Sequence, residues 1–486
     1  MNVEKIAEIL SDNKLLLKTV PETVNNFSRI ENLSCDSRSV SEGTLFFVKG
    51  VGFRPEYLDA AVGKGAVAYV AEKDCGAEIP LLLVSDVRKA MSCAARAFYG
   101  DMTESYPLVG ITGTKGKTST LYMLEGILKE KYPRVGVIST NEARCGEKTW
   151  KKTGTTPEAL ELFSILDGFR RENAGAAVME VSSQALKYDR VSGLTFSTGA
   201  FLNLAPDHIS PTEHSSFEDY RDSKKKLFQL CGNAVVNKDD KYAREFIDAA
   251  IGTRLITFSI SESADITAYD IHADRYGTTF SVRGRVSMED VRINMPGLFN
   301  VSNALCAIAC AYSLGIPEDL MKEGLGKASA AGRLEILEKN GITVLVDYAH
   351  NGSSFESVFD YADSFYPGAR KIILFGCIGD RALDRRTELP EVAGKRADFI
   401  VMSTDDPGTE DPESIFKEVE KELMKYPAPY VFIKDRKEAV GCAIDLAKPG
   451  DLVILAGKGS ETTQMVNGRP EPYIGDMQAA REKLQV

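Results

Sequence analysis

A glycine-rich run at residues 110–120, GITGTKGKTST, constrains the fold of this chain more than any other segment. Two apolar residues precede it and an apolar-periodic segment, residues 121–128, follows it, so we predict a strand, a loop and a helix. Such a loop directs backbone N–H groups at a phosphate, and the helix N-terminus adds a favourable dipole. Lys117 would neutralise phosphate charge, and Thr118 would offer a hydroxyl ligand to a phosphate-bound Mg²⁺.

The run departs from the usual phosphate-loop spacing, because Ile111 stands where the first glycine is expected. Its glycines are Gly110, Gly113 and Gly116. The alternative interpretation is a glycine-rich turn with an exposed lysine. The joint presence of the strand, the loop, the Lys-Thr pair and the helix favours phosphate binding.

The composition indicates a soluble globular protein of two to four domains. The chain has 486 residues, of which 43% are hydrophobic and 27% charged. Its net charge of −11 argues against a nucleic-acid partner, and no apolar run is long enough for a membrane span. The N-terminus does not resemble a signal peptide, and the nine cysteines lack metal-type spacing. We therefore expect a cytoplasmic protein with free thiols, no membrane insertion and a monomeric state.

Three α/β domains are predicted. Residues 1–107 form the first, in which the runs CDSRSV (35–40), TLFFVKG, AVAYVAE and PLLLVSD are expected to be strands. Residues 108–332 form the second, a phosphate-loop (P-loop) domain with a mostly parallel sheet. Four segments after Lys238, beginning with LITFSI, are expected to be antiparallel strands on its flank.

The third domain, residues 333–486, is predicted to be a doubly wound, Rossmann-like sheet. Five short apolar runs alternate with helical segments and end in glycine or aspartate. Ligands of such sheets bind beyond the carboxyl ends of the strands. The residues expected there are Asp347, Asp380, Asp405 and Lys458.

Several side chains of the second domain are candidates for the chemistry. Glu180 ends an apolar strand, where a carboxylate could hold Mg²⁺, although a solvated strand-end glutamate is an equal alternative. Asn203 and His208 follow another strand, and we favour His208 as a ligand because it shares the sheet edge. Lys224 lies in a helical segment, YRDSKKKLF, where periodicity alone also allows a solvated basic face. Residues 155–158, TTPE, are typical of a turn that precedes a helix.

Together the motifs resemble the Mur ligases of peptidoglycan synthesis, and specifically the MurE type. The resemblance covers nearly the whole chain. It rests on DSRSV (36–40), GTKGKTS, TTPE, MEVSS, the LN…DH pair, Y-x-x-S-K (220–224), GLFNVSNA (297–304), GRLE, DYAHN (347–351), GDR (379–381), DDPGTEDP (405–412) and GKGSE (457–461).

The resemblance implies a role for each matching residue. ATP would be bound by Gly113, Thr114, Lys115, Gly116, Lys117, Thr118, Ser119, Asn203, Asn303, Arg333 and Asp347. The metal ligands would be Thr118, Glu180, His208 and Lys224, the last as a carbamate, and Lys117, Glu180, His208 and Lys224 would be catalytic. The UDP-MurNAc-dipeptide would meet Ser37, Thr155, Thr156, Ser182 and Arg190, with Asp36 and Arg38 beside Ser37. The incoming amino acid would meet Arg381, Asp405, Asp406, Gly457 and Glu461.

Departures from the family pattern bear on the incoming amino acid. Enzymes that add meso-diaminopimelate usually carry D-N-P-R where this chain has residues 405–408, DDPG. Without that arginine, the distal carboxylate of diaminopimelate lacks its bidentate partner, whereas Asp406 suits the distal ammonium of lysine. Ser460 also replaces a histidine that most relatives carry. The lysine-adding branch is therefore favoured, with ornithine as another possible donor.

The resemblance implies an ATP- and Mg²⁺-dependent ligase that adds L-lysine to UDP-MurNAc-L-Ala-D-Glu through an acyl phosphate. The alternatives are the same ligase with meso-diaminopimelate or ornithine, and a related amide ligase acting on another carboxylate, such as a folate. A phosphate-loop ATPase or regulatory nucleotide-binding module is a third. The DSR loop argues against the folate ligase, and the candidate ligands Glu180, His208 and Lys224 argue against bare nucleotide binding.

Overall fold

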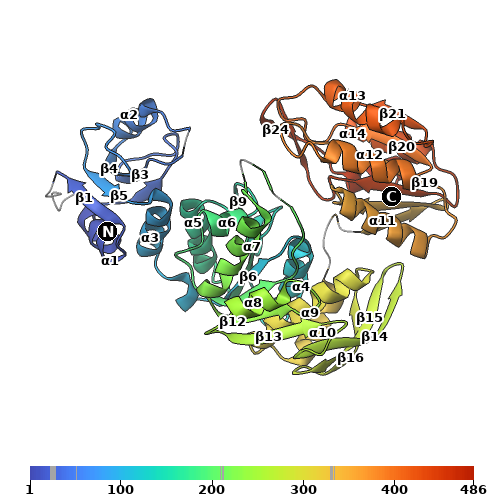
Figure 1. The fold of residues 1–486 in the computed structure, drawn as a ribbon, viewed down its shortest axis with the longest axis horizontal. Coiled ribbons are helices and arrows are strands. Elements are labelled where there is room, and N and C mark those ends of the chain that lie inside the picture. The colour runs from blue at the N-terminus through green and yellow to red at the C-terminus, as the bar shows by residue number, and fades with distance from the viewer. Residues whose placement is uncertain (22–28, 51, 208, 211–212, 329–331, 333) are drawn as a thin grey trace. The chain divides into compact units, whose positions relative to one another are not determined.

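A computed structural model describes the chain except for residues 22–28, 51, 208, 211–212, 329–331 and 333 (Figure 1). The chain forms two compact units. The first comprises Met1–Asp270, Phe280–Val291 and Phe299–Ala328, and the second comprises Ile271–Thr279, Arg292–Leu298 and Ser329–Val486. Among the described residues, no helix has both the length and the apolar character needed to cross a bilayer.

The first unit begins with a five-stranded sheet of order β1-β5-β4-β3-β2. All its strand pairs are parallel except β1 with β5, and α1 and α3 pack against it. Its elements are α1 (Val3–Asp12), β1 (Leu16–Val20), β2 (Asn32–Ser34), β3 (Thr44–Phe47), α2 (Pro55–Gly63), β4 (Ala66–Ala71), β5 (Leu81–Val84), α3 (Val87–Tyr99) and a 3₁₀ turn (Met102–Glu104).

The prediction of a strand at residues 35–40 is wrong, because this segment is a turn that follows β2. The side chain of Asp36 accepts a hydrogen bond from the Arg38 N–H at 2.9 Å, and Ser34 Oγ accepts one from the Asp36 N–H at 3.0 Å. These polar side chains satisfy backbone groups that a strand would pair with a neighbour.

An eleven-stranded sheet follows, of order β16-β15-β14-β13-β12-β11-β6-β10-β7-β8-β9. Its centre, β6, is fully buried and pairs in parallel with β10 and β11. The elements are β6 (Leu108–Thr112), α4 (Lys117–Lys129), β7 (Val135–Ile138), β8 (Ala143–Cys145), β9 (Lys148–Trp150), α5 (Ala159–Arg171), β10 (Ala176–Glu180), α6 (Ser183–Lys187), β11 (Phe196–Phe201), α7 (Phe217–Lys225), a 3₁₀ segment (Lys226–Leu230), β12 (Cys231–Asn237), α8 (Ala243–Ala249), β13 (Arg254–Ser259), β14 (Ile266–Asp274), β15 (Gly277–Gly284), β16 (Met288–Ile293), α9 (Leu298–Ser313) and α10 (Glu318–Lys327).

The predicted strand–loop–helix around the phosphate loop is confirmed by β6 and α4. The antiparallel pairing expected after Lys238 is wrong for the first of the flanking strands, because β13 pairs in parallel with β12 and β14 in parallel with β13. The helix α8 connects β12 to β13 and returns the chain to the same end of the sheet, which is the crossover that parallel pairing requires.

The second unit contains the predicted doubly wound sheet, of order β17-β18-β22-β19-β20-β21. The five predicted strands are parallel, and β17 was not foreseen and pairs antiparallel with β18. Alternate strand side chains contact α11, α12 and α13 on one face and α14 and α15 on the other. The elements are β17 (Glu335–Lys339), β18 (Ile342–Asp347), α11 (Gly352–Phe365), β19 (Lys371–Phe375), α12 (Arg385–Arg396), β20 (Phe399–Ser403), α13 (Pro412–Leu423), β21 (Tyr430–Ile433), α14 (Arg436–Asp445), β22 (Leu452–Ala456), β23 (Thr463–Val466), β24 (Arg469–Pro472) and α15 (Asp476–Leu484).

Candidate active site

The phosphate loop lies between the end of β6 and the first turn of α4. Gly116 precedes the helix with φ +85°, a conformation that favours glycine. A Cβ atom on Gly116 would lie 2.3 Å from Asn303 Oδ1, so this side chain of α9 packs directly against the loop. Lys117 Nζ donates to the carbonyls of Gly113 at 2.9 Å and Thr114 at 3.0 Å. The lysine ammonium therefore lies over the loop.

Asn203, beyond the end of β11, holds the other side of the loop. Its Oδ1 accepts a hydrogen bond from the Lys115 N–H at 2.9 Å, and its Nδ2 donates to the Lys115 carbonyl at 3.1 Å. Its carbonyl accepts from the Thr114 N–H at 3.0 Å. Ser119 is buried in the first turn of α4. The predicted residues of the loop are thus brought together with Asn203 and Asn303.

Glu180 is buried beside the loop and is held by two threonines. Thr118 Oγ1 donates to Glu180 Oε1 at 2.8 Å. The N–H of Thr140 donates to the same oxygen at 2.9 Å, and its hydroxyl donates to Glu180 Oε2 at 3.1 Å. The alternative of a solvated glutamate is wrong, since Glu180 is 1% exposed.

These oxygen donors fit a magnesium ion. Mg²⁺ takes one or two carboxylates together with substrate phosphates and water, and rarely an all-protein cage. Within the described residues no cluster of three or more His, Cys, Asp or Glu side chains forms a fuller metal site. His208, predicted as a further ligand, lies outside the described residues.

Lys224 lies at the end of α7 and points into the site. It is 2% exposed, and its Nζ donates to the Gly113 carbonyl at 2.9 Å. Burial, reinforced by the nearby charge of Lys117, lowers the pKa of Lys224 well below its ordinary value, with Asp207 opposing the shift. The Nζ also lies 4.5 Å from the ring centre of Tyr220, whose hydroxyl bonds with Thr114 Oγ1 at 3.0 Å. The alternative of a solvated basic face is therefore wrong.

Four of the residues expected to meet the dipeptide form a chain of contacts that begins at Glu180 and Thr140. Thr156 Oγ1 donates to the Glu180 carbonyl at 2.9 Å and accepts from the Ser182 N–H at 3.0 Å. The hydroxyls of Thr155 and Thr140 are 3.3 Å apart. Arg190 donates to the Thr156 carbonyl at 2.9 Å.

Glu158, the last residue of TTPE, is the partner of three cations. Its carboxylate lies 2.8 Å from Arg190, 2.7 Å from Lys49 and 3.8 Å from Arg88. Ion pairing outweighs burial and lowers the pKa of Glu158. These contacts join the dipeptide segment to the end of β3 and to α3. Ser37 lies in the turn after β2, where its carbonyl accepts from Lys64 Nζ at 2.8 Å.

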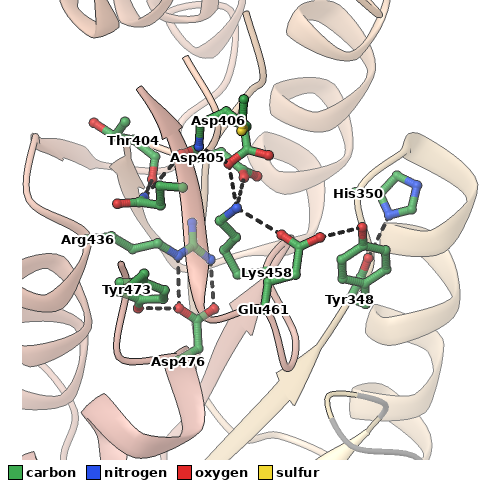
Figure 2. Close-up of polar contacts among 12 residues, drawn as sticks. Tyr348, His350, Thr404, Asp405, Asp406, Arg436, Lys458, Glu461, Tyr473 and Asp476 are labelled. Carbon is green, nitrogen blue, oxygen red and sulfur yellow. Dashed lines mark hydrogen bonds and ion pairs between the residues drawn. The ribbon is translucent and has the colours of Figure 1, made fainter. Parts of the chain in front are cut away.

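The second unit carries a group of four charged side chains, here called the carboxylate cluster (Figure 2). Lys458, the second residue after β22, is 0% exposed. Its ammonium lies 2.6 Å from Asp406, 2.8 Å from Glu461 and 3.4 Å from Asp405. Although burial alone would lower the pKa of Lys458, these carboxylates raise it above its ordinary value. Burial raises the pKa of Asp405, and Lys458 opposes this shift.

Further contacts fix the surroundings of the carboxylate cluster. The Tyr348 hydroxyl donates to Glu461 Oε1 at 2.8 Å. Arg436 forms a buried pair with Asp476, with N–O distances of 2.7 and 2.9 Å, as Figure 2 shows. Gly457 has φ +106°, and a Cβ there would lie 3.0 Å from Asp405 Oδ2.

Gly408 occupies a tight turn beside Asp380. Its φ is +61°, and a Cβ there would lie 1.9 Å from Asp380 Oδ2. The same carboxylate accepts from the N–H of Thr409 at 2.8 Å and from its hydroxyl at 2.7 Å. Gly408 is thus required by the turn, in addition to lacking the arginine of the diaminopimelate pattern.

The three remaining predicted residues have fewer contacts that bear on their roles, or lie outside the described residues. Arg381 is exposed in the turn after Gly379, where its charge acts on Asp380. The Asp347 carboxylate accepts backbone N–H groups of Leu334 at 2.9 Å and Ala349 at 2.7 Å. Arg333 lies outside the described residues.

Sequence reasoning missed some residues that the structure places at these sites. Thr140 ends the segment VGVIST and holds Glu180, and its position beyond a parallel strand was the available signal. Glu158 was passed over as part of a helix-preceding turn. Lys458 was expected at a strand end, but its contacts with Asp406 and Glu461 were not foreseen.

Comparisons with known proteins show which family this chain resembles. The Mur ligase middle domain matches residues 111–311, and the glutamate ligase domain of the Mur ligases matches residues 332–459. A UDP-N-acetylmuramoyl-L-alanyl-D-glutamate–2,6-diaminopimelate ligase of Caldanaerobacter subterraneus subsp. tengcongensis is 37% identical over 94% of this chain and 96% of its own. UDP-N-acetylmuramoyl-L-alanyl-D-glutamate–L-lysine ligases of Streptococcus thermophilus and Streptococcus pneumoniae are 34% and 33% identical, each over 100% of both chains.

Solved structures of related proteins have a similar fold. A UDP-N-acetylmuramoyl-L-alanyl-D-glutamate–2,6-diaminopimelate ligase has a TM-score of 0.67 at 25% identity and covers 96% of each chain. A folylpolyglutamate synthase of Mycobacterium tuberculosis shares the fold, with a TM-score of 0.64 at 14% identity over 82% of this chain and 95% of its own. With two domain matches and full-length relatives above 30% identity, the chain belongs to the Mur ligase family.

Proposed function

We propose that this protein is an ATP-dependent amide ligase that joins L-lysine, as the third peptide residue, to UDP-MurNAc-L-Ala-D-Glu. One observation carries the proposal: the phosphate loop and the predicted dipeptide-binding residues meet at Glu180, whose carboxylate accepts a hydrogen bond from Thr118 and whose backbone carbonyl accepts one from Thr156. A phosphoryl group and an acceptor carboxylate would therefore be held side by side. We also propose that it acts as a monomer in the cytoplasm.

The reaction has two covalent steps. The acceptor carboxylate attacks the γ-phosphorus of ATP, so that an acyl phosphate forms and ADP leaves. The α-amine of lysine then attacks the acyl carbon, the tetrahedral intermediate expels phosphate, and the amide remains after the amine has lost a proton. Lys117 offsets the charge repulsion of the first step, because its ammonium already lies over the loop.

Thr118 and Glu180 would hold Mg²⁺, with Thr140 fixing the orientation of the carboxylate. The bound ion would neutralise phosphate charge during transfer. We propose that Lys224 carries a carbamate and supplies a further anionic oxygen ligand. Its burial and its contact with the Gly113 carbonyl place it at the phosphate loop. Carbamylation joins Nζ of the neutral amine to the carbon of CO₂ and releases one proton, so that a buried amine becomes an anion that the metal ion would pair.

The carboxylate cluster supports a donor with a second amino group. Three carboxylates share the single ammonium of Lys458, so the cluster keeps an excess of negative charge when all three are ionised. A distal ammonium would compensate this charge, whereas a distal carboxylate would add to it. The relatives' names divide between lysine and diaminopimelate, and the charge of this cluster is our reason for favouring lysine.

Phosphate release tests the proposal. Purified protein with ATP and Mg²⁺ should release phosphate only when both UDP-MurNAc-L-Ala-D-Glu and an amino acid are present, and mass spectrometry should show the tripeptide product. Release with ATP alone would indicate an ATPase. Product formation with a folate and glutamate in place of the muramyl peptide would indicate the related ligase.

A further inference from the structure

Lys458 combines complete burial with a full set of anionic partners. An ammonium has three N–H donors, and three carboxylates surround this one. The Lys458 side chain is 0% exposed, whereas those of Asp406 and Glu461 are 20% and 28% exposed. The cation is therefore the inner member of the carboxylate cluster, and the carboxylates have the surface that a ligand can reach.

The two outer carboxylates are each fixed by a second contact. Asp406 Oδ1 accepts a hydrogen bond from the Met465 N–H at 3.0 Å. Glu461 uses Oε2 for Lys458 and accepts from the Tyr348 hydroxyl through Oε1. Lys458 thereby ties together the segments that follow β18, β20 and β22, as Figure 2 shows.

We infer that Lys458 is a positioning residue for the amino-acid donor, which holds the carboxylates of Asp406 and Glu461 in the geometry that binds the donor's amino groups. The inference rests on the proposed function, in which Asp406 and Glu461 meet the donor. Lys458 does not itself touch the donor, because its side chain is enclosed by the groups that it orients.

Removal of the ammonium would leave three neighbouring carboxylates without their shared counter-ion. Like charges so close together separate or take up protons. The pKa of Asp405, which burial raises and Lys458 holds down, would then rise further. Among the described residues, Arg436, which pairs with Asp476, the Tyr348 hydroxyl and the Cys377 thiol also face these carboxylates.

The test compares Lys458→Met, which keeps the length and removes the charge, with Lys458→Arg, which keeps the charge. Lys448→Met, at an exposed lysine of the same unit, is the matched control. We expect Lys458→Met to raise the KM for L-lysine at least about tenfold and to leave the KM for ATP and for the muramyl dipeptide within about twofold. The acid limb of kcat/KM for lysine should move to higher pH. Lys458→Arg should restore part of the donor affinity, and Lys448→Met should behave as wild type.

An unchanged donor KM in Lys458→Met overturns the inference, as does an equal loss for all three substrates with an unmoved acid limb. If Lys458→Met does not fold, Lys458→Gln, which retains N–H donors and lacks the charge, is held to the same criterion. Wild-type protein that forms no product with any diamino acid would refute the proposed function itself. If wild type forms product and the Lys458 variants have the same KM for lysine as wild type, only the role of Lys458 is refuted.

Discussion

Lys224 and Lys458 are both almost inaccessible to solvent, yet their surroundings shift their pKa values in opposite directions. Lys224 faces the Gly113 carbonyl and the cation of Lys117, so burial dominates and lowers its pKa. Lys458 faces three carboxylates, which outweigh burial and raise its pKa. The difference suits opposite tasks, because a neutral amine can react with CO₂, whereas a permanent cation can serve as a counter-ion.

We predict that Lys224→Ala is nearly inactive, with a loss of at least about 100-fold in kcat, and that short carboxylic acids added to the buffer restore part of the activity. The acid would replace the missing anionic oxygen ligand. Phosphate release measures this outcome. Lys225→Ala, the neighbouring residue that pairs with Asp222 at 2.8 Å, is the control and should keep its activity. Full activity of Lys224→Ala would contradict the carbamate.

At the scale of elements, the sequence was most informative where a pattern depends on local chemistry. Glycines, a Lys-Thr pair and apolar periodicity were sufficient to locate β6, the phosphate loop and α4. The prediction of a strand at residues 35–40 failed, because hydrogen bonds from backbone N–H groups to the side chains of Ser34 and Asp36 stabilise a turn in this segment. The surroundings of Lys458 depend on three strand ends that are far apart in sequence, and periodicity carries no information about such contacts.

The junction of α4 and α9 yields a prediction about nucleotide binding. Gly116→Ala would place a Cβ atom 2.3 Å from Asn303 Oδ1, so the Asn303 side chain would have to move away from the loop, and the alanine would be held at a φ of +85°. We expect the dissociation constant for ATP to rise at least about tenfold. Gly146→Ala is the matched control, because Gly146 also has positive φ, at +59°, but has open space around its Cβ position. Equal ATP affinity of both variants, by calorimetry, would show that the loop does not require this close contact.

For the molecule as a whole, His214 links stability to pH. It is buried between α6 and α7, where Ser183 bonds to Nε2 at 2.9 Å. Burial lowers the pKa of His214, with Asp219 opposing the shift and Lys187 and Lys224 reinforcing it. The unfolded chain therefore takes up this proton first as the pH falls below about 6.5, and the free energy of unfolding decreases.

We accordingly expect the urea midpoint of wild type to fall between pH 7.5 and about 5.5, and His214→Gln to fall less over the same interval. His272→Gln, at an exposed position of β14, is the control. Identical slopes for wild type and His214→Gln would exclude His214 as the source. The measurement needs no substrate, so it is independent of the proposed reaction.

The last prediction concerns which amino acid the whole enzyme uses as the donor. We expect kcat/KM to be at least about tenfold higher for L-lysine than for meso-diaminopimelate, which corresponds to about 1.4 kcal/mol. The carboxylate cluster would repel a distal carboxylate, and Gly408 has no side chain that could pair with it. Testing this by Gly408→Arg alone would be misleading, because the new side chain would collide with Asp380 in a left-handed backbone conformation.

Asp406→Asn is the sharper test, since it removes one charge of the cluster and keeps its shape. It should lower kcat/KM for lysine and narrow the ratio between lysine and diaminopimelate, measured with both donors in competition and resolved by product mass. Asp398→Asn is the control, because Asp398 lies at the opposite end of β20, and it should leave the ratio between lysine and diaminopimelate unchanged. Asp411→Asn is less suitable because Asp411 caps α13. Wild type that prefers diaminopimelate would overturn the argument from charge, and the specificity would then have to reside in residues other than the carboxylate cluster.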